Sequence, residues 1–448
     1  TRWYFVTGVQ TCALPISAGW LSARGAAADS IRLTLRLTAP GIAIAPHDSA
    51  VRQGDVFELR AVVTRNGRTV AADPTWSVAA GAGFVDTTGA AVGYADSLVV
   101  AATVPGAADT ARFTVLPRGV AGRFRLAPVG NGAVVERYTS DLWAVVRGGR
   151  TYAYTGTWGQ RALRGHVLYA WDATDPAAPA RVDSVVVGTG APGDVSTLND
   201  VKVSADGSLG VVTLEGATGS GSGNGIVLLD LADPAHPVVR ARYGQGLGNG
   251  VHNVWVEAIG GRTYVFACHD GDPASGLHVI DVTDIARPVT VAEFGVGTAP
   301  SEFVHDVLVR DGLAFVSHWD AGLVVVDVGN GIAGGRPDAP REVSRLVLPE
   351  GNVHNAWYWP ERALVFVGHE FGGQIGVSSA GLVSVVDVTD LRAPRRVATF
   401  ARSDAGPHNF WVDEAEAVLY AAYYNAGLLA IDVSGRLLGA LDRQGRLV

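Results

Sequence analysis

The sequence predicts an all-β protein in which a β-sandwich is followed by a six-bladed β-propeller. A short phrase centred on a histidine recurs in the second half of the chain at intervals of 53, 49 and 54 residues, at His252, His305, His354 and His408. Strand-rich repeats of about 50 residues are typical of propeller blades. Six apolar strands that each end in an aspartate follow one another after residue 121, and about seven short alternating strands precede them.

Residues 1–16 are left out of the domain assignment. The stretch from Phe5 to Ile16 resembles a translated sequencing adapter, and the whole chain contains no methionine. We therefore expect an artefactual segment and a fragment that does not cover the natural start or any secretion signal. Of the two cysteines only Cys268 lies outside this segment, so no intrachain disulfide is expected.

Residues 17–38 are predicted to be the remnant strand of a truncated sandwich domain. The segment from Ala28 to Leu35 matches the segment from Ala108 to Val115, which lies 80 residues later. That offset is the size of one such domain, so we expect further sandwich domains before this one.

Residues 41–117 have the pattern of a β-sandwich. The alternating run from Val56 to Val63 is followed by the hairpin signal Asn66-Gly67, and further short alternating strands come after it. The segment resembles the bacterial Ig-like domains of surface proteins, a type without a disulfide. Trp76 is expected in its core.

From about residue 121 to 448 each repeat unit contains an apolar strand that ends in an aspartate. In three units a turn of the form Asp-x-Thr-Asp and a proline follow. Because Asp and Thr side chains cap such turns, we interpret these aspartates as structural, with calcium binding as the alternative. The outer strand of the last blade is expected from residues 123–126 or from residues 436–441.

These units also resemble a known family. The apolar strand with its Asp-Val-Thr-Asp turn, as in Asp281–Asp284 and Asp387–Asp390, resembles the LVIVD repeat, a propeller repeat of bacterial surface proteins. The repeated His-Asn-x-Trp phrase resembles the choice-of-anchor B domain, which is built of such repeats. The resemblance covers about residues 121–448. It implies a secreted or surface-attached propeller, and it supplies no catalytic mechanism.

Composition limits the partners. The net charge is −8 and Lys202 is the only lysine, so no basic stripe exists for nucleic acid. No run of eighteen apolar residues predicts a transmembrane segment in this fragment. We expect an extracellular or cell-surface protein whose ligand is an unknown extracellular partner, either a protein or a glycan.

The histidines fall on two registers of the repeat. The first register is the start of the first strand, where Ser140 and Asn199 stand in the first two units and histidines in the other four. The second register is the end of the second strand, at His269, His318 and His369. Because these two strand ends are antiparallel neighbours, both registers are predicted to lie on one face of the ring.

Imidazoles suit transition metals such as zinc, iron and copper. The four histidines of the first register are therefore predicted to form the inner ring of a metal or ligand site. The three of the second register are predicted to surround that ring or to form a second site. Further candidates on this face are Asp270, Asp306, Asp320, Glu370, Asn199 and Tyr423.

Other interpretations stay open. The histidines could be structural, each with hydrogen bonds within and between blades, and Trp255, Trp357 and Trp411 could pack between the sheets. The favoured function is a binding or interaction module with a histidine-rich site at one mouth of the channel, because no nucleophile–base pair is recognisable. The alternative is a metal-dependent enzyme, oxidative or hydrolytic, that uses the histidine ring. A purely architectural spacer is the third possibility.

Overall fold

The protein is built almost entirely from β-strands. The computed structural model describes residues 39–119, 127–158, 165–188, 197–216, 223–269, 274, 276–371 and 379–448, and the backbone of residues 21–22 and 30–31. Within these residues the helical segments are three short 3-10 turns of three residues each. The chain divides into two compact units, Thr1–Gly119 with Arg443–Gly445 and Val120–Asp442 with Arg446–Val448. The all-β prediction is therefore confirmed.

The first unit contains two sheets whose strands are mostly antiparallel. One sheet has the strand order β3-β6-β7, and the other has the order β4-β10-β9-β5 with β8 paired to β9. The strand bounds are β3 Gly41–Ala45, β4 Ser49–Arg52, β5 Val56–Glu58, β6 Arg60–Arg65, β7 Arg68–Val70, β8 Thr75–Val85, β9 Ala90–Val104 and β10 Ala107–Leu116.

One hydrophobic core joins these two sheets. Ile44 from β3 packs in the same buried cluster as Leu98 from β9 and Phe113 from β10, and Trp76 packs against that cluster. Of the expected remnant strand at 17–38, the described backbone is the antiparallel pair β1 Leu21–Ser22 and β2 Ser30–Ile31. Residues 1–16 lie outside the described part of the chain.

The second unit begins with a sheet of eight strands. It is made of two four-stranded meanders that are joined by a single residue pair, Trp158 of β12 with Thr197 of β15. The first meander comprises β11 Tyr138–Arg147, β12 Arg150–Trp158, β13 Val167–Asp172 and β14 Ala180–Val186. The second comprises β15 Thr197–Val203, β16 Leu209–Glu215, β17 Gly225–Asp230 and β18 Val238–Tyr243.

Four further antiparallel meanders follow in chain order. Two have four strands, β19 Val251–Ile259, β20 Arg262–His269, β21 Leu277–Asp281 and β22 Val289–Phe294, then β23 Asp306–Arg310, β24 Leu313–Ser317, β25 Leu323–Asp327 and β26 Arg341–Leu346. The next is β27 Val353–Trp359, β28 Leu364–His369, β29 Leu382–Asp387 and β30 Arg395–Ala401. The last is β31 Phe410–Asp413, β32 Val418–Ala422 and β33 Leu428–Asp432.

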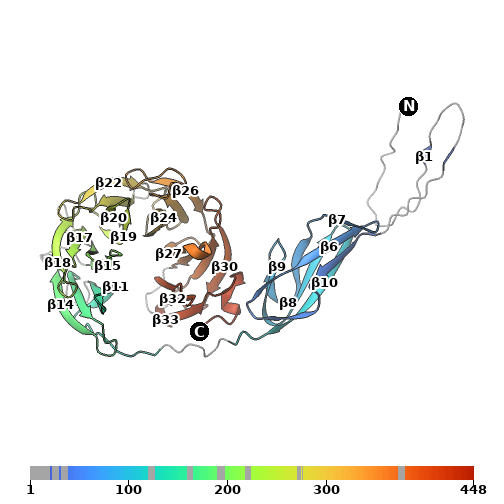
Figure 1. Ribbon diagram of the computed structural model, residues 1–448, viewed down its shortest axis with the longest axis horizontal. Coiled ribbons are helices and arrows are strands. Elements are labelled where there is room, and N and C mark those ends of the chain that lie inside the picture. Colours follow the sequence, from blue (N-terminus) through green and yellow to red (C-terminus); the bar gives the residue numbers. More distant parts are fainter. Residues whose placement is uncertain are drawn as a thin grey trace. The chain divides into compact units, whose positions relative to one another are not determined.

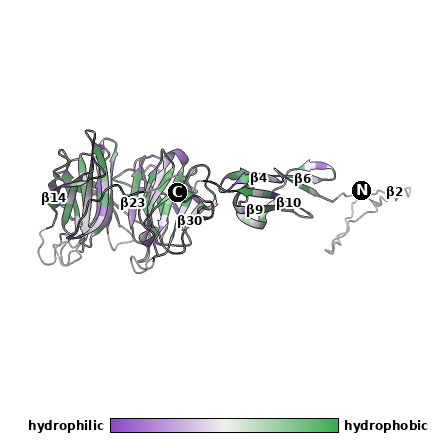
Figure 2. Cartoon of the chain, turned by 90° about the horizontal axis from the view of Figure 1, so that it is seen from below, coloured by the Kyte–Doolittle hydropathy of each residue, from purple (hydrophilic) through white to green (hydrophobic). Residues whose placement is uncertain are grey.

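The meanders of the second unit stand around a common centre, and the first strands β11, β15, β19 and β27 lie on its inner side (Figure 1). Consecutive meanders share hydrophobic cores: Phe266 of β20 packs in one cluster with Val316 of β24 and Val324 of β25. Many strand segments in this unit are hydrophobic, as the green ribbon in Figure 2 shows. Because each sheet covers the face of the next, this arrangement buries both faces of most sheets, as a β-propeller does.

The end of the chain completes the last meander. The Asp432 amide donates to the Arg446 carbonyl at 2.8 Å, the Val448 amide donates to the Ala430 carbonyl at 3.0 Å, and Leu447 pairs with Ile431. The prediction that residues 436–441 form this outer strand is therefore wrong. Within them β34, Gly439–Ala440, instead pairs in parallel with β30 of the preceding sheet. The alternative at residues 123–126 lies outside the described residues.

The aspartates at the ends of the third strands cap the turns that follow them. In each of the six, a carboxylate oxygen accepts a hydrogen bond from the backbone amide two residues later, in Asp172, Asp230, Asp281, Asp327, Asp387 and Asp432. Asp327 is buried, and five backbone amides between Gly329 and Gly335 donate to it. Although burial opposes ionisation, these donors hold the pKa of Asp327 at about 2.

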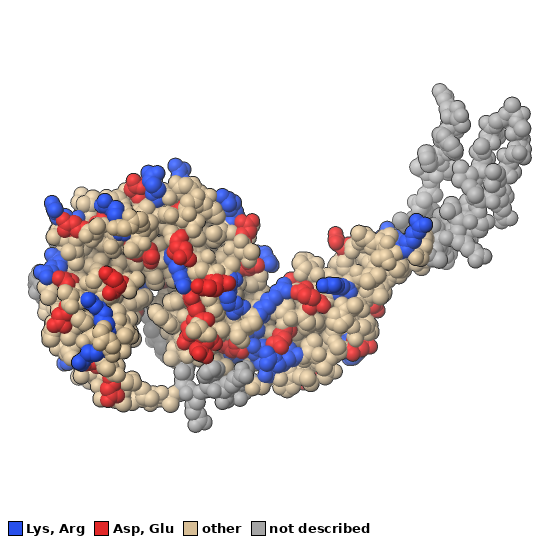
Figure 3. Space-filling view, viewed as in Figure 1, with Lys and Arg blue, Asp and Glu red and all other residues tan. Residues whose placement is uncertain are grey.

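Charged side chains of both signs lie on the surface, in agreement with the composition of the chain (Figure 3). On the face seen in Figure 3, basic and acidic side chains of the second unit are interspersed. In the described part of the chain, no helix is long and apolar enough to cross a membrane.

We predict that Asp327→Asn lowers the free energy of unfolding by roughly 2–3 kcal/mol, because an amide nitrogen would face two backbone donors. Asp230→Asn is the matched control, since Asp230 is more exposed and caps one backbone amide. Its expected loss is below about 1 kcal/mol. Urea denaturation of both variants measures the difference, and equal losses would contradict a special role for the Asp327 turn.

Candidate histidine site in the propeller channel

Irregularities in the first strands bring the first-register residues to the channel. The pairing of β19 with β20 is interrupted at His252 and Asn253, and the pairing of β27 with β28 is interrupted at His354. β11 and β15 have the same irregularity at their equivalent positions. Such bulges re-aim side chains and are common next to functional sites. In the two other first strands, β23 and β31, the histidine lies just before the strand.

Four imidazole rings from consecutive sheets form one continuous arc. The ring centroids of His252 and His305 are 4.7 Å apart, and those of His305 and His354 are 4.3 Å apart. The centroids of His354 and His408 are also 4.3 Å apart. The structure therefore brings together all four residues that the sequence places on the first register.

This arc lines a cavity of about 770 Å³. Glu370 and Tyr424 also line it, and the Tyr424 hydroxyl donates to the Glu370 carboxylate. Asn199 and Ser140, the first-register residues of the first two meanders, also line the cavity. The cavity volume falls within the range of small-molecule sites, which is about 300–1,000 Å³.

Three of the four imidazoles have a polar partner nearby. His252 Nδ1 lies 3.2 Å from a carboxylate oxygen of Glu215, and His305 Nδ1 donates to the backbone carbonyl of His354 at 2.8 Å. His354 Nε2 lies 3.5 Å from the Glu370 carboxylate. His354 Nδ1 is buried and has no hydrogen-bond partner among the described residues.

The environment favours neutral imidazoles. Burial lowers the pKa of His305 and His354 well below the usual value of histidine, and the neighbouring imidazoles add repulsion. Burial also lowers the pKa of His408, although Glu370 opposes the shift. Neutral imidazole is the form that accepts hydrogen bonds and coordinates metals. Donor atoms of His305, His354 and Glu370 all lie within 4.8 Å of one another.

The second register does not join this site. His318 and His369 are fully buried and have local partners: His318 Nε2 accepts from the Val296 amide, and His369 contacts the Gly351 carbonyl and the Ser384 hydroxyl. His269 is buried in its own sheet. The residues lining the cavity do not include these three histidines.

The pairing of the strands explains this correction. His269 is opposite Val251, and His369 is opposite Val353. Both valines are buried, and each lies one residue before a channel histidine. Because successive residues of a strand point to opposite faces, a shift of one residue places these histidines between the sheets.

Some of the other predicted candidates line the histidine cavity and others do not. Glu370 and Asn199 line the histidine cavity. Tyr423 also borders it, but the side chain is fully buried and its hydroxyl has no partner among the described residues. Asp320 is exposed outside the cavity, where it accepts a hydrogen bond from the Asn352 amide. Asp270 lies outside the described residues, and Asp306 belongs to the next layer of the channel.

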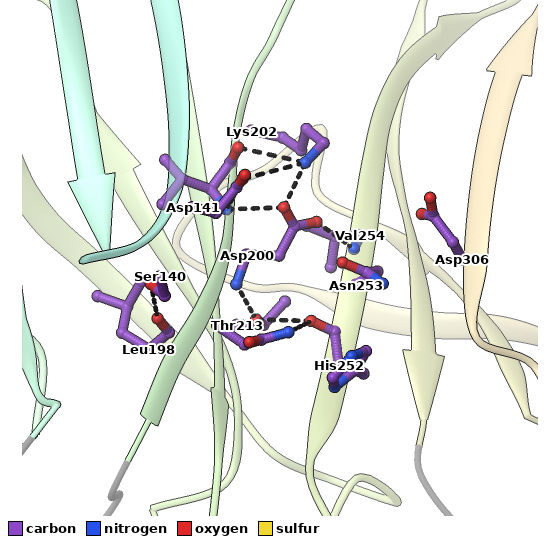
Figure 4. Close-up of polar contacts among 12 residues, drawn as sticks. Ser140, Asp141, Leu198, Asp200, Lys202, Thr213, His252, Asn253, Val254 and Asp306 are labelled. Carbon is purple, nitrogen blue, oxygen red and sulfur yellow. Dashed lines mark hydrogen bonds and ion pairs between the residues drawn. The ribbon is translucent and has the colours of Figure 1, made fainter. Parts of the chain in front are cut away.

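That next layer holds a buried charge cluster which sequence reasoning missed. Lys202 contacts the carboxylates of Asp200 and, at 3.4 Å, Asp141 (Figure 4). Asp306 from β23 faces the same region (Figure 4). Burial raises the pKa of Asp306 to about 6, and Lys202 partly offsets the shift. Burial alone would lower the pKa of Lys202, but the two aspartates outweigh it and raise that pKa.

Below this cluster, tryptophans contact one another around the channel. Trp143 lies 5.9 Å from both Trp255 and Trp411, and Trp357 lies 5.0 Å from Trp411, measured between ring centroids. The four line a cavity of about 410 Å³ together with Lys202. Trp255 and Trp357 also pack against hydrophobic clusters between neighbouring sheets, as expected, whereas Trp411 is 52% exposed.

We predict that Lys202→Met destabilises the protein by roughly 3–5 kcal/mol, because it leaves buried carboxylates without their cation. The double variant Lys202→Met/Asp200→Asn should regain part of that loss. The control is Arg240→Met, which removes a half-exposed partner of Asp230 and should change stability by less than about 1 kcal/mol. Urea denaturation provides the measurement, and a Lys202→Met variant as stable as Arg240→Met would refute the role of the cluster.

We also predict that acid destabilises the folded protein through the histidine arc. In the unfolded chain histidine titrates near pH 6.5, whereas the folded pKa values of His305, His354 and His408 are lower. Below pH 6.5 the unfolded chain therefore binds more protons, and stability falls as the pH drops toward those folded values.

Melting curves of chelator-treated protein between pH 7.5 and pH 5 test this. His354→Gln should reduce the decrease in melting temperature by a few degrees. His236→Gln, which removes an exposed histidine, should not. A decrease of the same size in wild type and His354→Gln would argue against the interpretation.

Comparisons with known proteins agree with the fold. The LVIVD repeat family matches residues 303–331, which include β23, β24 and β25. No curated protein matches the chain in sequence. A solved structure from Bacteroides uniformis, whose assignment as a 6-phosphogluconolactonase is provisional, is 10% identical, with a TM-score of 0.50 over 82% of this chain and 95% of that chain.

Two further structures resemble this chain. The β-propeller domain of Cps50 (Swd1) from Myceliophteria thermophila is 11% identical, with a TM-score of 0.45 over 70% of this chain and 93% of that chain. The C-terminal WD40 domain of Sif2 is 12% identical, with a TM-score of 0.43 over 77% of this chain and 79% of that chain. At such low identity the likeness concerns the fold alone. The ring of sheets and the matched repeat together identify the second unit as a β-propeller with an LVIVD repeat.

Proposed function

We propose that this chain is a secreted or cell-surface binding protein whose ligand enters the histidine-lined mouth of the propeller channel. The observation that carries the proposal is the arc of His252, His305, His354 and His408, which line one cavity from four consecutive sheets. A ring of sheets holds such side chains rigidly, so the site is formed before a ligand arrives. The fold itself is typical of interaction modules.

In this proposal the first unit is an Ig-like module that presents the propeller. Its two sheets around one core fit the Ig-like interpretation, although β4 pairs in parallel with β10. We interpret the eight-stranded sheet of the second unit as two blades, because one residue pair joins its halves. With the four later meanders this gives a propeller of six blades. The surface location rests on the resemblance to repeats and Ig-like domains of bacterial surface proteins.

The cavity favours a small ligand or the end of a glycan. Its imidazoles can accept or donate hydrogen bonds, and Glu370, Asn199 and Tyr424 add further polar groups. A second candidate function, a metal-dependent enzyme, is favoured by one observation: the convergence of donor atoms from His305, His354 and Glu370.

We predict that chelator-treated protein is stabilised by members of a panel of mono- and oligosaccharides, amino acids and dicarboxylates, measured by thermal shift. Each hit is then titrated by calorimetry into wild type, His408→Ala and His236→Ala. His408→Ala should weaken binding by at least about ten-fold, which corresponds to about 1.4 kcal/mol. His236→Ala should bind as wild type, because His236 lies outside the channel. A panel without hits, or hits that bind His408→Ala unchanged, would contradict the proposal.

A further inference from the structure

We propose that His305, His354 and Glu370 form a binding centre for one divalent transition-metal ion in the channel mouth. This inference rests on the proposed function and names the first component that the cavity would hold. Two imidazoles and one carboxylate are a donor set that zinc and iron accept while keeping open coordination positions. The other two histidines of the arc are not required as ligands.

The three donor groups already lie near a common point. Their ligand atoms are all within 4.8 Å of one another. Donor atoms bonded to a tetrahedral metal ion at about 2.0–2.1 Å lie roughly 3.3 Å apart. The groups would therefore approach one another by at most about 1.5 Å when an ion binds.

Neighbouring contacts fix the orientation of two of these groups. His305 Nδ1 donates to the His354 carbonyl at 2.8 Å, which leaves Nε2 as the coordinating atom. The Glu370 carboxylate accepts from the Tyr424 hydroxyl, and the Glu370 backbone exchanges two hydrogen bonds with Asn352. Metal sites characteristically hold their ligands by such contacts, because these fix the tautomer and the direction of each donor.

His354 faces the carboxylate of the same site. Its side chain is only 2% exposed, and its Nε2 lies 3.5 Å from the Glu370 carboxylate. The ring lies between those of His305 and His408, at 4.3 Å from each.

The cavity leaves room for a further ligand on the ion. His252 is oriented by Glu215 at 3.2 Å and stands beyond His305 in the arc. Asn199 and Ser140, which also line the cavity, have no charge, whereas Asp141 beside Ser140 is an acid. Two neutral imidazoles and one carboxylate leave a divalent ion with a net positive charge, so its open positions would attract water or an anionic oxygen ligand.

The experiment uses the full chain, purified without chelator and then treated with EDTA. Metal content is measured before and after treatment by mass spectrometry. Zn²⁺, Cu²⁺, Ni²⁺ and, without oxygen, Fe²⁺ are titrated separately by calorimetry, and Co²⁺ serves as the spectroscopic probe. We expect about one ion per chain and visible Co²⁺ absorption of a site with few ligands.

Glu370→Gln keeps the shape of the side chain, and His354→Gln keeps a polar group. Each should weaken metal binding by at least about ten-fold and change the Co²⁺ spectrum. His236→Ala, which removes an exposed histidine outside the cavity, is the control and should bind the ion as wild type does. Binding of less than one ion to wild type, or equal binding by wild type, Glu370→Gln and His354→Gln, would overturn the proposal. So would an equal loss of the ion in His236→Ala.

Circular dichroism of each variant shows whether it folds. If Glu370→Gln or His354→Gln unfolds, the test uses the other of these two variants. The ligand panel under "Proposed function" is run on metal-free protein, so the two proposals fail separately. Panel binding that depends on His408 without any metal binding would leave the binding function standing and remove the metal centre.

Discussion

The channel wall depends on hydrogen bonds that each first strand makes to the first strand of the next sheet. Asn199 donates to the carbonyl of His252, Asn253 donates to the carbonyl of His305, and His305 donates to the carbonyl of His354. The Asn355 amide, in the orientation that satisfies both neighbours, donates to the His408 carbonyl. These bonds are short links between sheets whose outer strands diverge. They fix the spacing of the recurring positions and therefore the spacing of whatever side chains stand there.

Lys202 strengthens the same wall where three meanders meet. Asp200 contacts Lys202 and also accepts from the Val254 amide of the following sheet at 2.8 Å. Lys202 in turn contacts Asp141 of the preceding meander. Burial raises the pKa of Asp200 to about 8, although Lys202 opposes the shift. The cluster therefore specifies how these sheets meet more than it adds to stability.

Sequence periodicity predicted the all-β fold and the meeting of the four first-register histidines, since equivalent positions of a repeat must converge in a ring. It did not predict where His269 and His369 lie. A bulge in the neighbouring first strand shifts the pairing by one residue, and the repeat period does not indicate such a bulge. The charge cluster, in contrast, has a signal in the sequence. Counted three residues after the first register, Lys202 replaces the tryptophan of other units, such as Trp255. Which carboxylates would pair with it depends on side-chain geometry between sheets.

The same hydrogen bonds argue against a purely structural role for the four histidines. Where a link between sheets is needed, asparagine makes it, as Asn199 and Asn253 do. His305 makes such a link itself, from Nδ1 to the His354 carbonyl. His354 and His408 accept such links through their backbones, so these links do not need their rings. Imidazoles that these links do not need, held at contact distance around one cavity, favour the proposed ligand site.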